Sequence, residues 1–277
     1  MRKMTIFAMF FIFVPPSNAY QEPNRLPASV KRQTFEIGPE MYYFRYEEPG
    51  LMKTTGKFKG IKGTYTSHEW MPETPVLPFN NGKLMVEGRF ASGSADFDGQ
   101  VLGGAAVNTD NFDAFTTEFR FLIGMDELKQ NRTNTFYAGL GIRYFNDKGP
   151  RDAVGYNRES TYCYVPIGLK TDRLLKYGWS FSATGEFDFF LIDLFLVDDD
   201  EDEFNDDCDT DVEDRHLSGM GLRGSFSFEK QFKGSSFKVE PFVRFWYIPE
   251  WEEDEHELGF EPENNTLECG VQLIWTF

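Results

Sequence analysis

The chain has 277 residues, of which 45 are acidic and 28 are basic, so that its formal net charge is −17 at pH 7. This balance excludes a general nucleic-acid-binding role, because the basic surface that neutralises phosphates is missing. Aromatic residues make up 17% of the sequence, and the three cysteines, Cys163, Cys208 and Cys269, form no disulfide framework.

The first 32 residues have the pattern of a secreted protein. Arg2 and Lys3 precede a short apolar run over residues 5–14, and Ser17-Asn18-Ala19 supplies a small-x-small cleavage site. The run is too short to span a bilayer as a helix, so residues 1–19 are predicted to be a signal peptide. Residues 20–32 are polar, contain two prolines, and are predicted to be a periplasmic N-terminal tail.

From residue 33 onward, apolar and polar side chains alternate with the period of a β-strand. Turn signals such as Glu47-Glu48-Pro49-Gly50 separate the alternating segments. We count ten such segments: residues 33–46, 56–68, 83–96, 112–125, 135–145, 161–170, 179–191, 217–230, 237–248 and 267–277. The second segment, 56–68, has the weakest alternation.

The last segment defines the expected fold. Its apolar side chains, from Leu267 to Phe277, occupy one face, and polar or small residues occupy the other. Strands of about ten residues with one apolar face and aromatic ends are the units of transmembrane β-barrels. Residues 33–277 are therefore predicted to form an all-β, antiparallel, up-and-down transmembrane barrel. Ten strands are expected, and eight or twelve are also compatible with the pattern.

The membrane assignment follows from the same alternation. No later segment is apolar over the length of a transmembrane helix, and open sheet edges are not tolerated in hydrocarbon. The expected location is the bacterial outer membrane, with both termini periplasmic and outer-membrane lipid as a partner. The aromatic end, Trp275 and Phe277, resembles the terminal strand that outer-membrane barrels present to the barrel assembly machinery.

The inward-facing positions carry nine acidic and eight basic residues, which nearly cancel. A barrel of about eight to ten strands has an interior that side chains can fill, and buried charges there must be paired. We therefore predict a packed polar lumen. Its charge network is predicted to contain Glu36, Glu40, Glu87, Arg89, Glu118, Arg120, Arg143, Glu186, Arg223, Glu240, Arg244 and Glu268. A narrow cation channel is an alternative, although a channel would favour one dominant sign of charge.

The excess negative charge lies in two predicted loops, residues 198–214 and 250–263. Oxygen-rich clusters of this kind suit hard divalent cations, and Asp198, Asp199, Asp200 and Asp202 are weak Ca²⁺ candidates. The stretch lacks the glycine and the spacing of a twelve-residue calcium loop. A solvated, self-repelling loop is the competing interpretation. No motif indicates a cofactor.

Two residue pairs at the predicted outer ends of strands resemble the omptin proteases, which are also ten-stranded barrels. The pairs are Asp96-x-Asp98 and Asp214-x-His216. The resemblance implies that His216, oriented by Asp214, would activate a water, with Asp96 and Asp98 completing the site. The alternative function is therefore an endopeptidase that cleaves basic peptides. His68 and His256 have no partnering pattern and are expected to be solvated.

Longer stretches resemble a family of uncharacterised small outer-membrane β-barrel proteins. The stretches are residues 36–40, 46–50, 156–159, 162–168, 185–188 and 261–268. This resemblance implies a fold and a location but no activity. The sequence thus favours a structural or surface-interaction role without catalysis.

Overall fold

The structure is a computed structural model that describes residues 33–68, 81–100, 106–147, 157–198, 214–216, 219–252, 260–261 and 263–277. The predicted signal peptide and periplasmic tail lie outside the described residues, as do Cys208 and His256. Lys31–Phe277 forms one compact unit.

Ten long antiparallel strands make up most of the described chain. They are β1 (Gln33–Glu48), β2 (Met52–Ser67), β3 (Asn81–Gln100), β4 (Ala106–Lys129), β5 (Arg132–Asp147), β6 (Asn157–Leu174), β7 (Trp179–Asp198), β9 (Met220–Gln231), β10 (Ser236–Ile248) and β13 (Asn264–Thr276). Shorter elements are η1 (Lys176–Gly178), β8 (Asp214–His216), β11 (Trp251–Glu252) and β12 (Phe260–Glu261).

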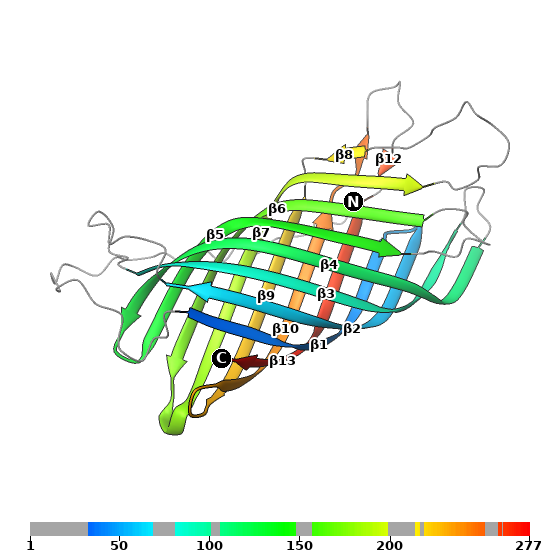
Figure 1. Ribbon diagram of the computed structural model, residues 1–277. Helices are drawn as coiled ribbons and strands as arrows, with labels where there is room; N and C mark the ends of the chain where they lie inside the picture. Colours follow the sequence, from blue (N-terminus) through cyan, green and yellow to red (C-terminus); the bar gives the residue numbers. More distant parts are fainter. Residues whose placement is uncertain are drawn as a thin grey trace. The chain divides into compact units, whose positions relative to one another are not determined.

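The sheet closes on itself. Consecutive long strands pair with each other, β13 pairs with β1, and β6 pairs with β7, so every long strand has two neighbours. Figure 1 shows the strands running side by side at a common tilt. The prediction of a ten-stranded up-and-down barrel is confirmed. The predicted segments lie within the observed strands or overrun them by a few residues.

The two ends of the barrel differ. β1 begins and β13 ends at one of them, here called the termini end, and the tight β4–β5, β6–β7 and β9–β10 connections lie there too. The connections after β3, β5, β7 and β10 lie at the opposite end, here called the loop end. The predicted turn after β1 is also at the loop end, where Leu51 N donates to Glu48 O at 3.0 Å and Gly50 has a φ of 84°.

Side-chain exposure alternates along the strands as the sequence predicted. In β1, Glu40, Tyr42 and Phe44 are buried, whereas Met41 and Tyr43 are exposed. The outward residues are those that the alternation assigns to lipid, and the inward residues fill the barrel. Within the described residues, no helix is long and apolar enough to cross a membrane.

Two interior tyrosines lie flat over glycines on neighbouring strands. A Cβ added to Gly141 of β5 would lie 2.2 Å from the ring of Tyr164 of β6. In the same way, a Cβ added to Gly168 of β6 would lie 2.2 Å from the ring of Tyr137 of β5. The missing side chains let each ring cross the neighbouring strand. The Tyr164 hydroxyl thereby reaches Glu118 of β4, to which it donates at 2.6 Å.

The substitution Gly141→Val should displace Tyr164 from Glu118. A hydrogen bond to a charged group contributes about 1.5–3 kcal/mol, so the free energy of unfolding should fall by about that amount. Urea titration of the protein in detergent, followed by near-ultraviolet circular dichroism, would measure this change.

Gly185→Val is the matched control, because a Cβ there meets no atom within 4 Å and the residue is exposed. Equal destabilisation by the two substitutions would contradict the proposed role of the Tyr164 packing.

Candidate functional site: the barrel interior

One carboxylate lies at the centre of the charged interior. Glu268 of β13 accepts hydrogen bonds from Arg89 at 2.7 Å, Arg143 at 2.8 Å and Arg244 at 3.0 Å. These arginines come from β3, β5 and β10, so the contacts cross the lumen as well as linking neighbouring strands. Glu40 of β1 joins the cluster by accepting from Arg89 at 2.5 Å and from Arg244 at 3.3 Å.

A second cluster is built around Arg223 of β9. Its guanidinium donates to Glu118 at 2.6 and 3.0 Å and to Asp188 at 2.6 Å. Arg120 of β4 bridges Glu186 and Glu87 on the same side of the interior. Arg89 lies 3.9 Å from Glu118, which connects the two clusters into one network.

All twelve residues of the predicted charge network form ion pairs with other inward-facing side chains. The network also contains members that the sequence reasoning missed, including Asp126 and Asp172, which pair with Lys83 and Lys170. The predicted segments ended before both aspartates, although each continues the inward side-chain alternation.

The arginines are also covered by aromatic rings. The Arg143 guanidinium lies 4.2 Å from the ring centroid of Trp246, and Arg89 lies 4.8 Å from that of Tyr42. Cation–π contacts of this kind are strongest where water is excluded. The carboxylates are therefore held between guanidinium groups in a buried layer. In Glu40, Glu118 and Glu268, both carboxylate oxygens accept hydrogen bonds from arginines. None of the three is therefore placed to accept a proton from a substrate as a general base.

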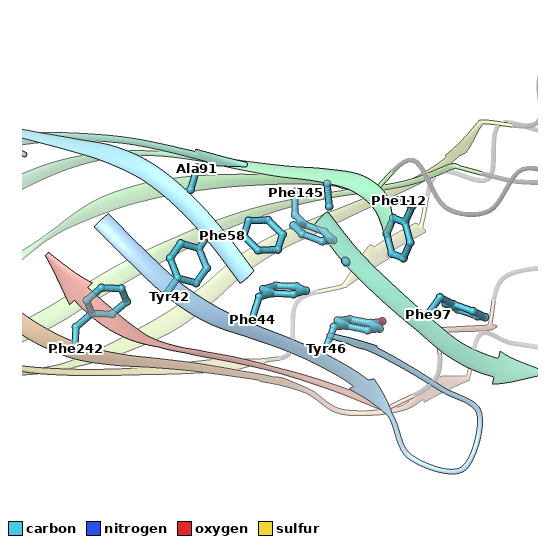
Figure 2. Close-up of a cluster of buried hydrophobic side chains, with 11 residues drawn as sticks. Tyr42, Phe44, Tyr46, Phe58, Ala91, Phe97, Phe112, Phe145 and Phe242 are labelled. Carbon is cyan, nitrogen blue, oxygen red and sulfur yellow. The ribbon is translucent and has the colours of Figure 1, made fainter. Parts of the chain in front are cut away.

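An aromatic cluster fills the lumen on the loop-end side of the network. Figure 2 shows Tyr42, Phe44, Phe58 and Phe145 projecting toward one another from β1, β2 and β5. Phe44 lies 5.0 Å from Phe58 and 5.0 Å from Phe145, measured between ring centroids. Tyr46, Phe97, Phe112 and Phe242 extend the cluster.

The aromatic cluster adds to the predicted packed polar lumen a layer that the sequence analysis did not identify. Most of its rings were not assigned to the interior, because aromatic residues are expected on the lipid face. Continuing the alternation along the strand would have found them, since Phe44 has the parity of Glu40 and Tyr42, and Phe58 that of Lys62. The interior is therefore polar in its middle layer and aromatic toward the loop end.

A polar cavity of about 260 Å³ occupies the termini-end side. Lys62, Lys83, Lys170 and Lys238 line it, and Arg89, Arg120, Arg223 and Arg244 of the network form part of its wall. The lysines are paired with carboxylates, as in the 3.0 Å contact of Lys238 with Glu36.

His68 also lines this cavity, with its Nε2 atom 3.5 Å from Asp126. The expectation that His68 is solvated and lacks a partner was wrong. No local pattern indicated this pair, because Asp126 is distant along the chain and comes close to His68 only when β2, β3 and β4 pair side by side.

The four residues of the omptin-like alternative are not gathered in the described structure. Asp96 and Asp98 of β3 are exposed on the outward face, and Asp96 accepts a hydrogen bond from the backbone N of Asn111 at 3.1 Å. Asp214 and His216 form β8, whose backbone pairs with β7, and their side chains lie outside the described residues.

The calcium candidates fall largely outside the described residues: Asp199, Asp200 and Asp202 are not described, and only the backbone of Asp198 is. Within the described residues, no group of three or more His, Cys, Asp or Glu side chains is placed to hold a metal ion. Trp275 and Phe277, the predicted assembly signal, are exposed on the outward side at the termini end.

Comparisons with known proteins identify the fold. No family model matches the chain, and no curated protein matches it. Among solved structures, the outer membrane protease OmpT from Escherichia coli is similar, with a TM-score of 0.60 and 12% identity over 92% of this chain and 100% of that chain. The likeness at this identity shows the fold alone.

Two channels are more distantly similar. The TodX monoaromatic hydrocarbon channel, as a deletion mutant, has a TM-score of 0.37 and 8% identity over 90% of each chain. A channel from Pseudomonas putida F1 has a TM-score of 0.36 and 9% identity over 94% of this chain and 100% of that chain. The closed ten-stranded sheet, together with the likeness to OmpT, shows that the chain has the fold of an outer-membrane β-barrel.

Removing the central carboxylate should destabilise the barrel strongly. Glu268→Ala leaves Arg89, Arg143 and Arg244 with too few acceptors, and breaking a buried ion pair costs about 3–5 kcal/mol. The free energy of unfolding in detergent should fall by that amount, as measured by urea titration.

Glu47→Ala serves as the control for a partly exposed ion pair, because Glu47 pairs with Arg45 on the outer wall. Such pairs contribute about 0–1 kcal/mol. If Glu268→Ala were as mild as Glu47→Ala, the interior network would not be a stabilising centre.

Proposed function

We propose that the protein is a closed, non-conducting outer-membrane barrel with a structural or surface-interaction role, and that it stands with both termini in the periplasm. The proposal rests on the observation that paired charged side chains and aromatic rings fill the barrel interior. Arg89, Arg143 and Arg244 converge on Glu268 from three strands, and the aromatic cluster lies beyond them. A barrel filled in this way offers a stable platform for its outer loops.

The proposed orientation rests on connection lengths. Tight turns such as β4–β5 and β9–β10 belong on the periplasmic side of outer-membrane barrels, and long loops belong outside. The acidic segments 198–214 and 250–263 would then be presented outward. We propose lipid and the assembly machinery as partners, with Trp275 and Phe277 as the assembly signal and divalent cations as weak ligands of the loops.

A narrow cation channel is less well supported. Conduction needs a continuous wet path, whereas the termini-end cavity is bounded by network arginines such as Arg223 and Arg244. The loop-end side holds rings in contact, including Tyr42 and Phe58 with centroids 5.4 Å apart. The cavity is lined by lysines and arginines together with carboxylates such as Glu36 and Glu87, whereas a cation path favours a row of acidic side chains.

The omptin-like endopeptidase is the second alternative. β8, which contains Asp214 and His216, adjoins β7 at the loop end. Both β8 and β9 pair with β7. Around the barrel, β3 and β9 are five strands apart in either direction, so β8 lies across the barrel from β3. A site between them would need inward-pointing acids on β3, whereas Asp96 and Asp98 are exposed on the outward face.

The purified protein in planar lipid bilayers should give no conductance steps, because paired charges and packed rings occupy the interior over the residues that the structure describes. A sixteen-stranded porin in the same bilayer would verify insertion conditions and sensitivity. Insertion of the test protein itself would be verified by protease protection in matched liposomes.

Reproducible cation-selective steps from the inserted protein would contradict the closed-barrel proposal and support the channel. The same preparation, incubated with basic peptides, should leave them intact. Cleavage that is lost in Asp214→Ala would instead support the endopeptidase.

A further inference from the structure

The outer wall of the barrel is largely free of charge at mid-height. In the described chain, the outward positions of β1 from Phe35 to Tyr43 carry no charged side chain, and those of β13 from Leu267 to Trp275 carry none. The same is true of β10 from Phe237 to Tyr247. This is the composition expected of a surface that contacts lipid.

β2 departs from this pattern. Lys57 and Lys59 are exposed and share the outward parity of Ile61 and Tyr65. Lys59 is paired in register with Met41 of β1, which is itself 55% exposed. Two ammonium groups therefore project from the outer wall beside apolar side chains that face lipid.

Neither lysine has an acidic partner in the described part of the chain. The inward-facing lysines differ in this respect, as Lys238 lies 3.0 Å from Glu36 and Lys62 lies 3.6 Å from Glu87. A lysine on a lipid-facing wall is costly unless its flexible stem carries the ammonium group to a polar partner. For Lys57 and Lys59 that partner must come from outside the described fold.

The neighbouring strand supplies hydroxyl groups at the same level. Ser94 of β3 is paired in register with Lys57, and Ser92 with Lys59. Both serines are exposed on the outward face. The Ser94 hydroxyl donates to Asn111 Oδ1 at 3.4 Å. The two ammonium groups and the Ser92 hydroxyl therefore form the donor set for phosphate oxygens, which carry negative charge and accept several hydrogen bonds.

A groove adjoins this donor set on β3 and β4. It has a volume of about 590 Å³ and includes Ser92 and Gly93 in its lining. Its apolar sides are Phe90 and Phe115, whose ring centroids are 6.1 Å apart. Asp113, on the far side from β2, also lines the groove and would keep a phosphate on the lysine side.

We propose that the outer wall over β2–β4 binds a phosphorylated lipid of the surrounding leaflet. The phosphate lies between Lys57 and Lys59, the hydroxyl of Ser92 donates to it, and an acyl chain lies along the groove against Phe90 and Phe115. Charge complementarity favours this occupant, because both unpaired groups on β2 are cationic. The proposal requires the barrel to stand in a lipid leaflet and does not depend on whether it conducts.

Native mass spectrometry of the folded protein in non-ionic detergent would test the site. The probes are dioleoyl phosphatidic acid and dioleoylglycerol, which share acyl chains and differ by the phosphate. The wild-type protein should retain one phosphatidic acid in preference to dioleoylglycerol. Lys57→Gln combined with Lys59→Gln should reduce that preference on the order of tenfold or more, because each lysine near an anionic headgroup contributes about 1 kcal/mol.

Two further variants make the test specific. Lys57→Arg with Lys59→Arg should keep the preference, because it keeps both charges. Lys176→Gln with Lys233→Gln removes two exposed lysines from termini-end turns and should also keep it. Heat-dependent mobility on gels would verify that each variant folds.

An unchanged preference in the Lys57→Gln and Lys59→Gln variant would overturn the proposal. So would an equal loss of both probes, which would mean that the phosphate is not recognised. A dimer in the wild-type spectrum that this variant abolishes would also overturn it, since a second copy would then cover the wall.

Discussion

The requirement that every backbone polar group be paired within hydrocarbon determines the architecture of this protein. A sheet with free edges leaves unpaired N–H and C=O groups, whereas a closed barrel pairs them all between strands. Closure depends on the junction of the first and last long strands, β1 with β13, because all the other long strands pair with their neighbours along the chain. It also assigns each residue to the inside or the outside, because the side-chain period is two. The interior and the outer wall can then be treated as two separate surfaces.

The interior surface must solve the problem of buried charge. Glu268, Arg89 and Arg244 can remain ionised without bulk water because each has partners of opposite sign at hydrogen-bonding distance. Aromatic rings cover this layer toward the loop end, and a small polar cavity remains toward the termini. Such an interior fits a rigid scaffold better than a transport path. On the outer wall, Lys57 and Lys59 interrupt a belt that carries few charged side chains.

The sequence predicted the fold well, because alternation is a local property that every strand carries. It also placed Glu268 and Arg143 on the inward face, but it could not identify their partners. The contact between Glu268 and Arg143 joins residues 125 positions apart and crosses the lumen, so it depends on barrel closure and stagger. The aromatic cluster was missed for another reason, since Phe44 and Phe58 have side chains that suit lipid and core equally. Only the parity of a position along its strand distinguishes an inward ring from an outward one. Tyr164, which packs over Gly141 in the interior, is a further example.

The central claim is that parity alone decides which side chains face lipid, and two tryptophans of opposite parity can test it. Trp246 is buried in the interior, whereas Trp275 is 43% exposed on the outward side. Two single-tryptophan variants, each retaining one of them, would be folded into vesicles of brominated phosphatidylcholine. The account predicts strong quenching of Trp275 fluorescence and little quenching of Trp246. Equal quenching of the two, or the reverse order, would contradict it.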